Sequence, residues 1–149
     1  MKNNKIYLDT SVISALFDQR TPERRAMTVT AWETFSAYEV YISEIVLAEL
    51  NSTSGALKEN MLNSISSFHV LRVTDEAHRL ASEYILQTIF PQKYYDDALH
   101  VALASTNQIP ILLSWNFTHL VKLKTRQMIK LVNTMNHYIA VEIISPPEL

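Results

Sequence analysis

Carboxylate side chains stand next to strongly apolar segments at three places in this sequence. Asp9 follows the apolar "KIYL", Glu49 lies within "SEIVLAEL", and Asp96 and Asp97 directly precede the run "ALHVALA". Carboxylates repel one another and are costly to remove from water, so residues in such positions stay solvated, cap a helix or bind a cation. Carboxylates that share a divalent cation typically serve hydrolysis at a phosphoryl group.

Each of these acids also has an explanation that involves no chemistry. An aspartate directly after a strand, such as Asp9, often caps the following turn, and a helical glutamate such as Glu49 is usually solvated. Either Asp96 or Asp97 stabilises the positive end of a helix dipole by about 0.3–1 kcal/mol, but capping does not account for both. We expect Asp97, which lies one step further into the apolar helix, to face an enclosed site, and Asp96 to be solvated or to cap the helix.

A fourth candidate lies in the stretch "LLSWNFTHL", where an apolar segment ends. Asn116 in this stretch either forms a turn or contributes its amide to a site. Asp9, Glu49, Asp97 and Asn116 all fall at strand ends or helix starts, which an alternating chain places at one edge of the sheet. Because the set offers oxygen ligands without cysteine or clustered histidine, it predicts Mg²⁺ or Mn²⁺ and phosphoryl hydrolysis.

Short apolar segments alternate with helical patterns along the chain, which predicts strands and helices in turn. The predicted strands are residues 5–8, 40–42, 69–73, 109–114 and 140–144. The predicted helices are residues 21–38 with Thr21 as N-cap, 44–50 after Ser43, a segment from about 54, 75–89 after Thr74, 94–104, and 125–138. This alternation predicts an α/β fold of three layers, α/β/α, with a central, mainly parallel sheet. No linker or repeat divides the chain, so residues 1–149 are predicted to form a single domain.

The composition excludes several function classes. The 149 residues contain no apolar run near the roughly 20 residues that a membrane span needs and no signal-peptide pattern, so we expect a cytoplasmic protein without a membrane partner. The absence of cysteine excludes thiol catalysis, Cys-ligated zinc and iron–sulfur clusters. The single glycine, Gly55, argues against a glycine-rich nucleotide-binding motif. The net charge of −2 does not by itself indicate a nucleic-acid partner.

Four motifs together resemble the PIN domain family, and within it the VapC-type toxins of bacterial toxin–antitoxin pairs. The motifs are "YLDTSVI" with Asp9, "SEIVLAEL" with Glu49, "DDALHVALA" with Asp97 and "LLSWNFTHL" with Asn116, and the resemblance spans residues 6–120. It implies a parallel-sheet α/β/α fold and a Mg²⁺- or Mn²⁺-dependent endoribonuclease that cleaves RNA, forms a homodimer and is inhibited by a small cognate antitoxin. It also implies that Asp9, Glu49 and Asp97 are the metal ligands and that Asn116 occupies the fourth catalytic position.

The sequence departs from this family at the fourth position. Many relatives have a carboxylate at or near Asn116, and the aspartate often found three residues later is His119 here. Either Asn116 or His119 therefore fills that position. An alternative function follows from the same departure, namely a PIN fold with a weakened site that acts by binding RNA or protein.

Several other residues have both a functional and a structural interpretation. Thr10 and Ser11 either support the metal ligands or form a turn, and His100, on the helix face of Asp97, either lines the site or packs in the core. Trp115 either stacks on a base of RNA or is an ordinary, partly buried aromatic residue. Two basic clusters are candidates for phosphate contacts or for solvated helix faces: Arg20, Arg24 and Arg25, and Lys122, Lys124, Arg126 and Lys130.

Overall fold

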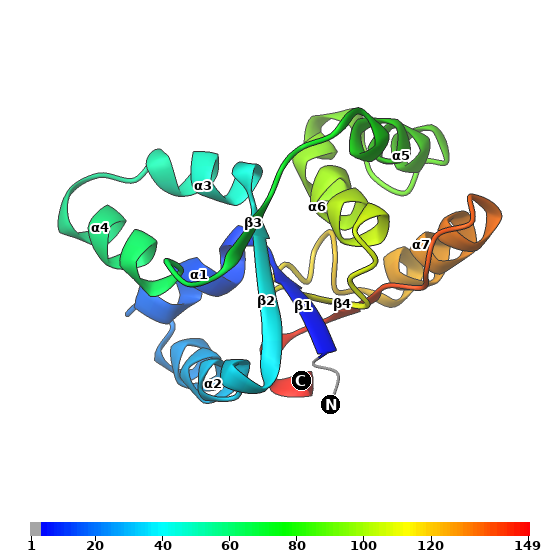
Figure 1. Cartoon of the computed structure of the whole chain (residues 1–149). Coiled ribbons are helices and arrows are strands. Elements are labelled where there is room, and N and C mark those ends of the chain that lie inside the picture. The colour runs from blue at the N-terminus through cyan, green and yellow to red at the C-terminus, as the bar shows by residue number, and fades with distance from the viewer. Residues whose placement is uncertain (1–3) are drawn as a thin grey trace.

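The computed structural model describes residues 4–149 and consists of a sheet between two layers of helices (Figure 1). Residues 1–3, predicted to belong to the same domain, lie outside the described residues. All five strands run parallel, in the order β3-β2-β1-β4-β5. Their bounds are β1 Asn4–Leu8, β2 Tyr38–Ser43, β3 His69–Leu71, β4 Ile111–Leu113 and β5 Glu142–Ile144.

The helices lie on both faces of this sheet, with α1 to α4 on one side and α5 to α7 on the other (Figure 1). The described residues also form three short 3-10 helices, of which η1 precedes β2, η2 precedes α6 and η3 follows β5. This arrangement confirms the predicted three-layer fold with a parallel sheet. The bounds are α1 Thr10–Phe17, α2 Pro22–Glu33, η1 Phe35–Ala37, α3 Glu44–Asn51, α4 Gly55–Ser64, α5 Asp75–Leu86, η2 Gln92–Tyr94, α6 Tyr95–Thr106, α7 Leu123–Met135 and η3 Pro146–Glu148.

Strand β1 shows how the sheet separates two hydrophobic cores. Successive side chains of a strand point to opposite faces. Tyr7 therefore packs into the core beneath α5, α6 and α7, while Ile6 and Leu8 pack into the core beneath α1, α2 and α3. All three side chains are fully buried, as expected for the middle strand of a sheet with two covered faces.

The order of the strands reverses at β1, because β2 lies on one side of it and β4 on the other. In open α/β sheets, such a reversal leaves a crevice at the carboxyl ends of the two strands, where ligands typically bind. Asp9 directly follows β1 and Ser114 directly follows β4, so both residues lie at this point. The fold therefore places the first candidate carboxylate where a parallel sheet usually carries a site.

Helix α1 was not predicted from the sequence. It begins at Thr10, directly after β1, and Asp9 caps it by accepting a hydrogen bond from the backbone N–H of Ser11 at 3.0 Å. The helix is only eight residues long and places Val12 and Ile13 in the core. Its two opening hydroxyl residues resemble a turn as much as a first helical turn, which is why the pattern was missed.

The predicted helix over residues 21–38 is too long. Helix α2 ends at Glu33, because Phe35 turns into the core and packs against Trp32 and Phe68 at ring-centroid distances of 5.0 and 6.2 Å. The chain then passes through η1 and enters β2 at Tyr38. The other predicted strands and helices are present, with ends that differ by a few residues.

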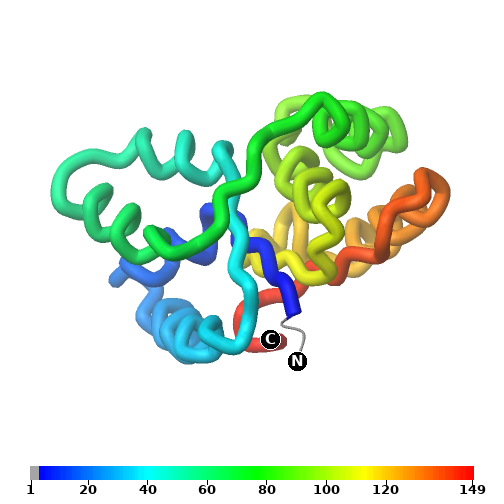
Figure 2. Tube along the Cα trace, in the orientation of Figure 1, coloured from blue at the N-terminus to red at the C-terminus, as the bar shows by residue number. Residues whose placement is uncertain are grey.

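The C-terminal segment returns to the neighbourhood of α2 after the last strand. Figure 2 shows η3, in red, close to α2, and the two elements are in contact. Ser145 and Glu148 form a capping box that fixes this short helix. Among the helices of residues 4–149, none combines the length and apolar character that crossing a membrane requires.

Candidate active site

Asp9 is a buried carboxylate whose oxygen atoms are both hydrogen-bonded. Its Oδ1 accepts from the backbone N–H and the hydroxyl of Ser11, at 3.0 and 2.5 Å, and its Oδ2 accepts from the Ser114 hydroxyl at 2.6 Å. Burial raises the pKa of Asp9 above its usual range, although the charge of His100 and these hydrogen bonds oppose the increase. Asp9 therefore caps α1, as its structural interpretation required, and its two carboxyl oxygens are also held in place at the carboxyl ends of β1 and β4.

Glu49 reaches the same edge from α3. Its Oε1 accepts hydrogen bonds from the Thr10 hydroxyl at 2.6 Å and from Nε2 of His100 at 3.0 Å, while 38% of its side chain is exposed. Burial raises the pKa of Glu49, but the hydrogen bonds from His100 and Thr10 outweigh it, so the pKa lies below its usual range. Glu49 is therefore a positioned carboxylate and not an ordinary solvated helical residue.

His100 links Glu49 to the core through a chain of hydrogen bonds. Its Nδ1 lies 2.7 Å from the Tyr7 hydroxyl, which lies 2.7 Å from the Ser43 hydroxyl. Burial lowers the pKa of His100, but the bond to Glu49 and the charges of the nearby carboxylates raise it above its usual range. When His100 carries both protons, it donates to Tyr7 and to Glu49 at the same time.

Sequence reasoning missed Tyr7 and Ser43. Ser43 was predicted only as the N-cap of α3, but its side chain makes no capping hydrogen bond and bonds to Tyr7 instead. One signal was present in the sequence, because Tyr7 places a hydroxyl in the middle of the otherwise apolar strand that ends at Asp9. A buried tyrosine hydroxyl needs a partner, and here the partner is the network behind the site.

Asp97 and Asp96 open helix α6 with different environments. Asp96 is exposed, whereas Asp97 is half-buried. Burial raises the pKa of Asp97, the charges of His100 and His119 oppose that increase, and the charges of Asp9 and Glu49 add to it. Asp9, Glu49 and Asp97 therefore share one electrostatic environment.

The three carboxylates fit a divalent cation by their chemistry. They offer hard oxygen atoms and mutually unfavourable charges, which a bound cation would compensate. As they stand, no three acidic or histidine side chains in residues 4–149 converge closely enough to hold one ion between them. Hydrogen bonds from Ser11 and Ser114 fix Asp9, whereas Glu49 and Asp97 are only partly buried and remain accessible from solvent.

Asn116 and His119 both lie in the turn that follows β4. The side-chain oxygen of Asn116 accepts a hydrogen bond from the backbone N–H of His119 at 3.0 Å, and its own backbone N–H donates to the Ser114 hydroxyl at 2.9 Å. The ring of His119 lies against that of Tyr94, with centroids 3.8 Å apart and the two planes tilted by 36°, and its charge acts on Asp97. Asn116 thus forms the turn, and both residues remain candidates for the fourth position.

Comparisons with known proteins give one family and a set of structural relatives. A family model described as "PIN domain" matches residues 6–116, which contain all four candidate site residues. The fold is similar to that of VapC20 from Mycobacterium tuberculosis, described as a toxin that cleaves the sarcin–ricin loop, with 18% identity and a TM-score of 0.59 over 92% of this chain and 98% of that one. It is also similar to VapBC2 from Rickettsia felis, solved bound to a DNA fragment from its promoter, with 16% identity and a TM-score of 0.55 over 95% of this chain and 98% of that one. A search among curated proteins finds no match.

Proposed function

The chain belongs to the PIN domain family, and from this premise we propose that it is a metal-dependent endoribonuclease and the toxin of a type II toxin–antitoxin pair. The observation that carries the proposal is the buried carboxylate of Asp9 at the point where the strand order reverses, with Glu49 and Asp97 in the same electrostatic environment. The two similar structures, of VapC20 and VapBC2, support the same class of function.

In this proposal Asp9, Glu49 and Asp97 hold Mg²⁺ or Mn²⁺, which would supply positive charge to the scissile phosphate and activate a water molecule. The protein's own contribution is to hold the carboxylates in place. Ser11 and Ser114 donate to Asp9 and fix its orientation in the crevice. The carboxylate of Asp9 cannot then rotate away from the ion without breaking buried hydrogen bonds.

Glu49 is positioned so that one of its oxygen atoms stays available. Thr10 and His100 both donate to Oε1, so Oε2 would be the oxygen atom left to bind the cation. His100 is held in turn by Tyr7, whose hydroxyl bonds to Ser43. We therefore assign Thr10 and His100 as positioning residues for Glu49 and Tyr7 as the support of His100.

The partners in this proposal are an RNA substrate, a small cognate antitoxin and a second copy of the chain in a cytoplasmic homodimer. They rest on membership of the family. A second candidate function is a PIN fold that binds RNA or protein without cleaving it. The observation that favours it is Asn116, which brings no charge to the fourth position and whose side-chain oxygen is engaged in a turn.

The experiment that separates the two functions is cleavage of a mixed RNA pool by the purified full chain. We expect cleavage with Mg²⁺ or Mn²⁺ and none with EDTA. Asp9→Asn, Glu49→Gln and Asp97→Asn should each reduce cleavage by at least a hundredfold while the circular dichroism spectrum stays native. Asp96→Asn is the matched control, because Asp96 is the exposed neighbour of Asp97 and should retain activity. Wild-type protein that binds RNA without metal-dependent cleavage would favour the binding module instead.

A further inference from the structure

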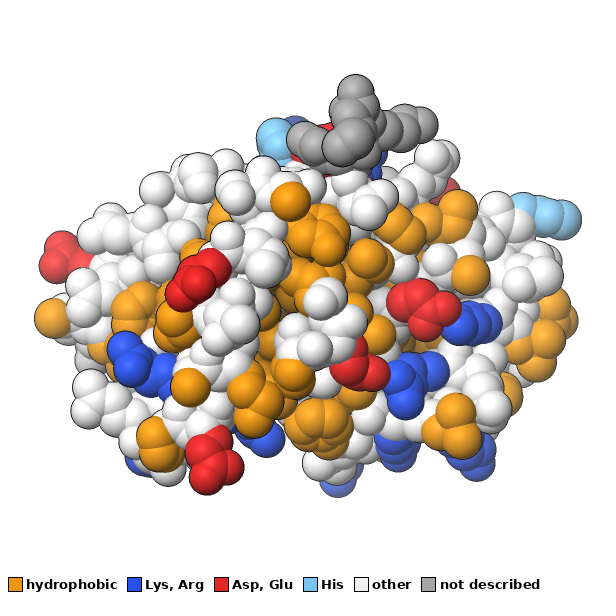
Figure 3. Space-filling model, turned by 90° about the horizontal axis from the view of Figure 1, so that it is seen from below, with side chains coloured by type: hydrophobic (Ala, Val, Ile, Leu, Met, Phe, Trp, Pro, Cys, Tyr) orange, Lys and Arg blue, Asp and Glu red, His pale blue; other side chains and the backbone are white. Residues whose placement is uncertain are grey.

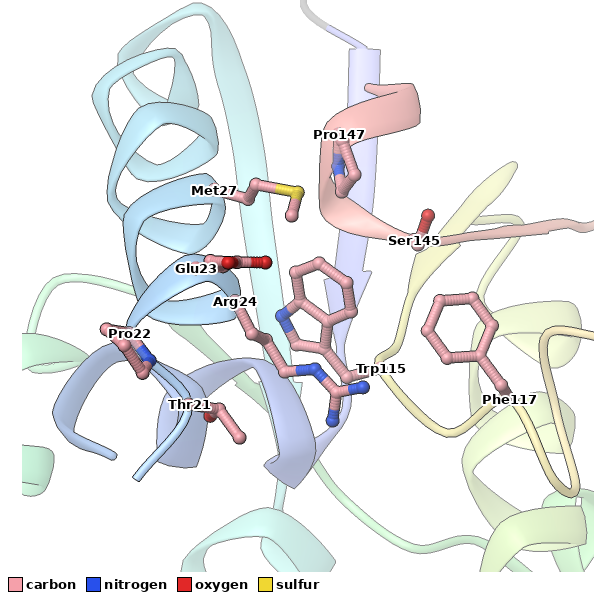
Figure 4. Close-up of a pocket in the computed structure, with 9 residues that line it drawn as sticks. All are labelled: Thr21, Pro22, Glu23, Arg24, Met27, Trp115, Phe117, Ser145 and Pro147. Atoms are coloured by element: carbon pink, nitrogen blue, oxygen red, sulfur yellow. The ribbon is translucent and has the colours of Figure 1, made fainter. Parts of the chain in front are cut away.

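A cavity of about 540 Å³ lies between helix α2 and the C-terminal segment (Figure 4). Arg24 and Met27 reach it from α2, Trp115 and Phe117 reach it from the segment after β4, and Pro147 reaches it from η3. Trp115 forms its floor, since only 6% of that residue is exposed, whereas Phe117 is 47% exposed and Met27 is 41% exposed. The cavity therefore combines a buried aromatic floor with accessible apolar walls.

Two charged residues line this largely apolar cavity, the basic Arg24 and the acidic Glu23, both from α2. The guanidinium of Arg24 lies over the ring of Trp115, 4.9 Å from the centroid, and 5.9 Å from the centroid of Phe117 (Figure 4). Within residues 4–149 Arg24 forms no salt bridge, and the nearby Asp18 pairs with Arg20 at 3.0 Å instead. The quadrupole of an aromatic ring attracts a cation to its face, so the two rings hold the guanidinium and leave its positive charge available to an anionic ligand.

Two hydrogen bonds connect the cavity to the candidate active site. The backbone N–H of Trp115 donates to the Ser11 hydroxyl at 2.8 Å, and that hydroxyl donates to Asp9 at 2.5 Å. The indole N–H of Trp115 donates to Thr28 at 2.9 Å, which fixes the ring. Trp115, which forms the floor of the cavity, is therefore two hydrogen bonds away from the Asp9 carboxylate.

Apolar exposure alone does not mark a binding site here. Seen from below, apolar side chains reach the surface through the middle of the molecule, with acidic and basic side chains around them (Figure 3). Isolated exposed apolar residues are normal on folded proteins. The cavity differs because it combines aromatic rings, an arginine without a carboxylate partner and a direct connection to Asp9.

We infer that this cavity takes an unpaired base of the RNA strand next to the phosphate that is cleaved. The inference rests on the proposed ribonuclease function, which it deepens by naming a subsite for single-stranded RNA. The base lies against Phe117 and Met27, above Trp115, and Arg24 contacts the adjoining phosphate. Planar bases stack on aromatic and arginine side chains, and the phosphate supplies a negatively charged partner for the guanidinium of Arg24. An apolar peptide would fill the cavity but would bring no anion to Arg24.

The test compares cavity variants with matched surface controls in cleavage of single-stranded RNA by the full chain. Phe117→Ala and Arg24→Gln should each raise KM about fivefold or more with little change in kcat. Leu131→Ala and Arg79→Gln remove an exposed apolar side chain from α7 and an exposed arginine from α5, and both should leave KM unchanged. For RNA with an abasic nucleotide next to the cut, wild type and Phe117→Ala should have the same KM. Unchanged KM in both cavity variants would overturn the inference.

A second measurement separates this inference from the proposed function. In a Trp32→Phe protein, Trp115 is the remaining tryptophan, and short single-stranded RNA should change its fluorescence in EDTA, where no cleavage is expected. A fluorescence change without cleavage in Mg²⁺ would refute the ribonuclease and support the subsite. Cleavage without a fluorescence change, or loss of a protein partner in the cavity variants with normal RNA kinetics, would refute the subsite alone.

Discussion

The Ser114 hydroxyl should stabilise the protein by more than a typical hydrogen bond, because its partner is a buried carboxylate. Ser114 is fully buried and donates to Oδ2 of Asp9 at 2.6 Å. It also accepts a hydrogen bond from the backbone N–H of Asn116 at 2.9 Å. In Ser114→Ala both groups lose this partner, and the charged oxygen of Asp9 stays in a place that water does not easily reach.

The expected loss follows from these two contacts. A hydrogen bond to a charged group contributes about 1.5–3 kcal/mol and a neutral one about 0.5–1.5 kcal/mol. Asn116 is half-buried, so water replaces part of its bond, and the total loss in free energy of unfolding is about 2–4 kcal/mol. For a chain of this length that corresponds to a decrease in Tm of roughly 4–16 °C. Urea unfolding in EDTA, followed by circular dichroism, measures it.

A double-mutant cycle identifies the charge of Asp9 as the cause. In an Asp9→Asn background the partner is neutral, so Ser114→Ala should lower the free energy of unfolding by only about 1 kcal/mol. Ser64→Ala is the control, since it removes a hydroxyl that donates to the neutral carbonyl of Met61 at 2.6 Å. Equal losses from Ser114→Ala in both backgrounds would refute this account of the site.

Two other predictions concern the fourth position and the pH dependence. Asn116→Asp should lower the Mn²⁺ concentration for half-maximal cleavage severalfold and Asn116→Ala should raise it, because a carboxylate binds a cation better than an amide does. If His119→Ala is inactive and Asn116→Ala behaves like wild type, the fourth position belongs to His119 instead. In EDTA, the pKa of His100 lies above its ordinary value of about 6.5, so His100 stabilises the fold fully below pH 6.5 and loses this effect as the pH rises through its folded-state pKa. The pKa of Glu49 lies below its ordinary value of about 4.3, so Glu49 stabilises the fold fully above pH 4.3 and loses this effect as the pH falls through its folded-state pKa. The difference in unfolding free energy between wild type and His100→Gln should therefore be largest between about pH 4.3 and 6.5, and a difference that grows above pH 7 would contradict this.

The sequence predicted the sheet and the four candidate residues because both depend on local patterns. A short apolar segment followed by an aspartate is visible without a structure, and the strand order then brings Asp9 and Asn116 to neighbouring positions. The preference for Asp97 over Asp96 as a metal ligand came from helical position. The partial burial of Asp97 and the charges that act on its pKa support the proposal that Asp97 is the ligand.

The hydrogen-bond network behind the carboxylates could not be predicted in the same way. Tyr7, Ser43 and His100 come from β1, the end of β2 and α6, and their contacts span 36 and 93 residues. Each has an ordinary local interpretation, as strand, cap and core residue. Only the packing of α6 over β1 brings the three side chains into one series of hydrogen bonds that ends at Glu49. The arginine of the cavity, Arg24, was likewise visible only as one member of a basic cluster.

The two roles of Asp9 determine which substitution can test the site. The carboxylate caps α1 and accepts from Ser11 and Ser114, so Asp9→Ala removes a cap contributing about 0.5–2 kcal/mol and leaves two hydroxyls without their acceptor. Loss of activity in Asp9→Ala would therefore not distinguish a damaged fold from a missing ligand. Asp9→Asn keeps one accepting oxygen for the cap, removes the charge and places a donating NH2 group where the second carboxylate oxygen was. Because burial raises the pKa of Asp9, that charge is unfavourable in the metal-free protein, so Asp9→Asn should unfold no more easily than wild type in EDTA while losing any stabilisation by Mn²⁺.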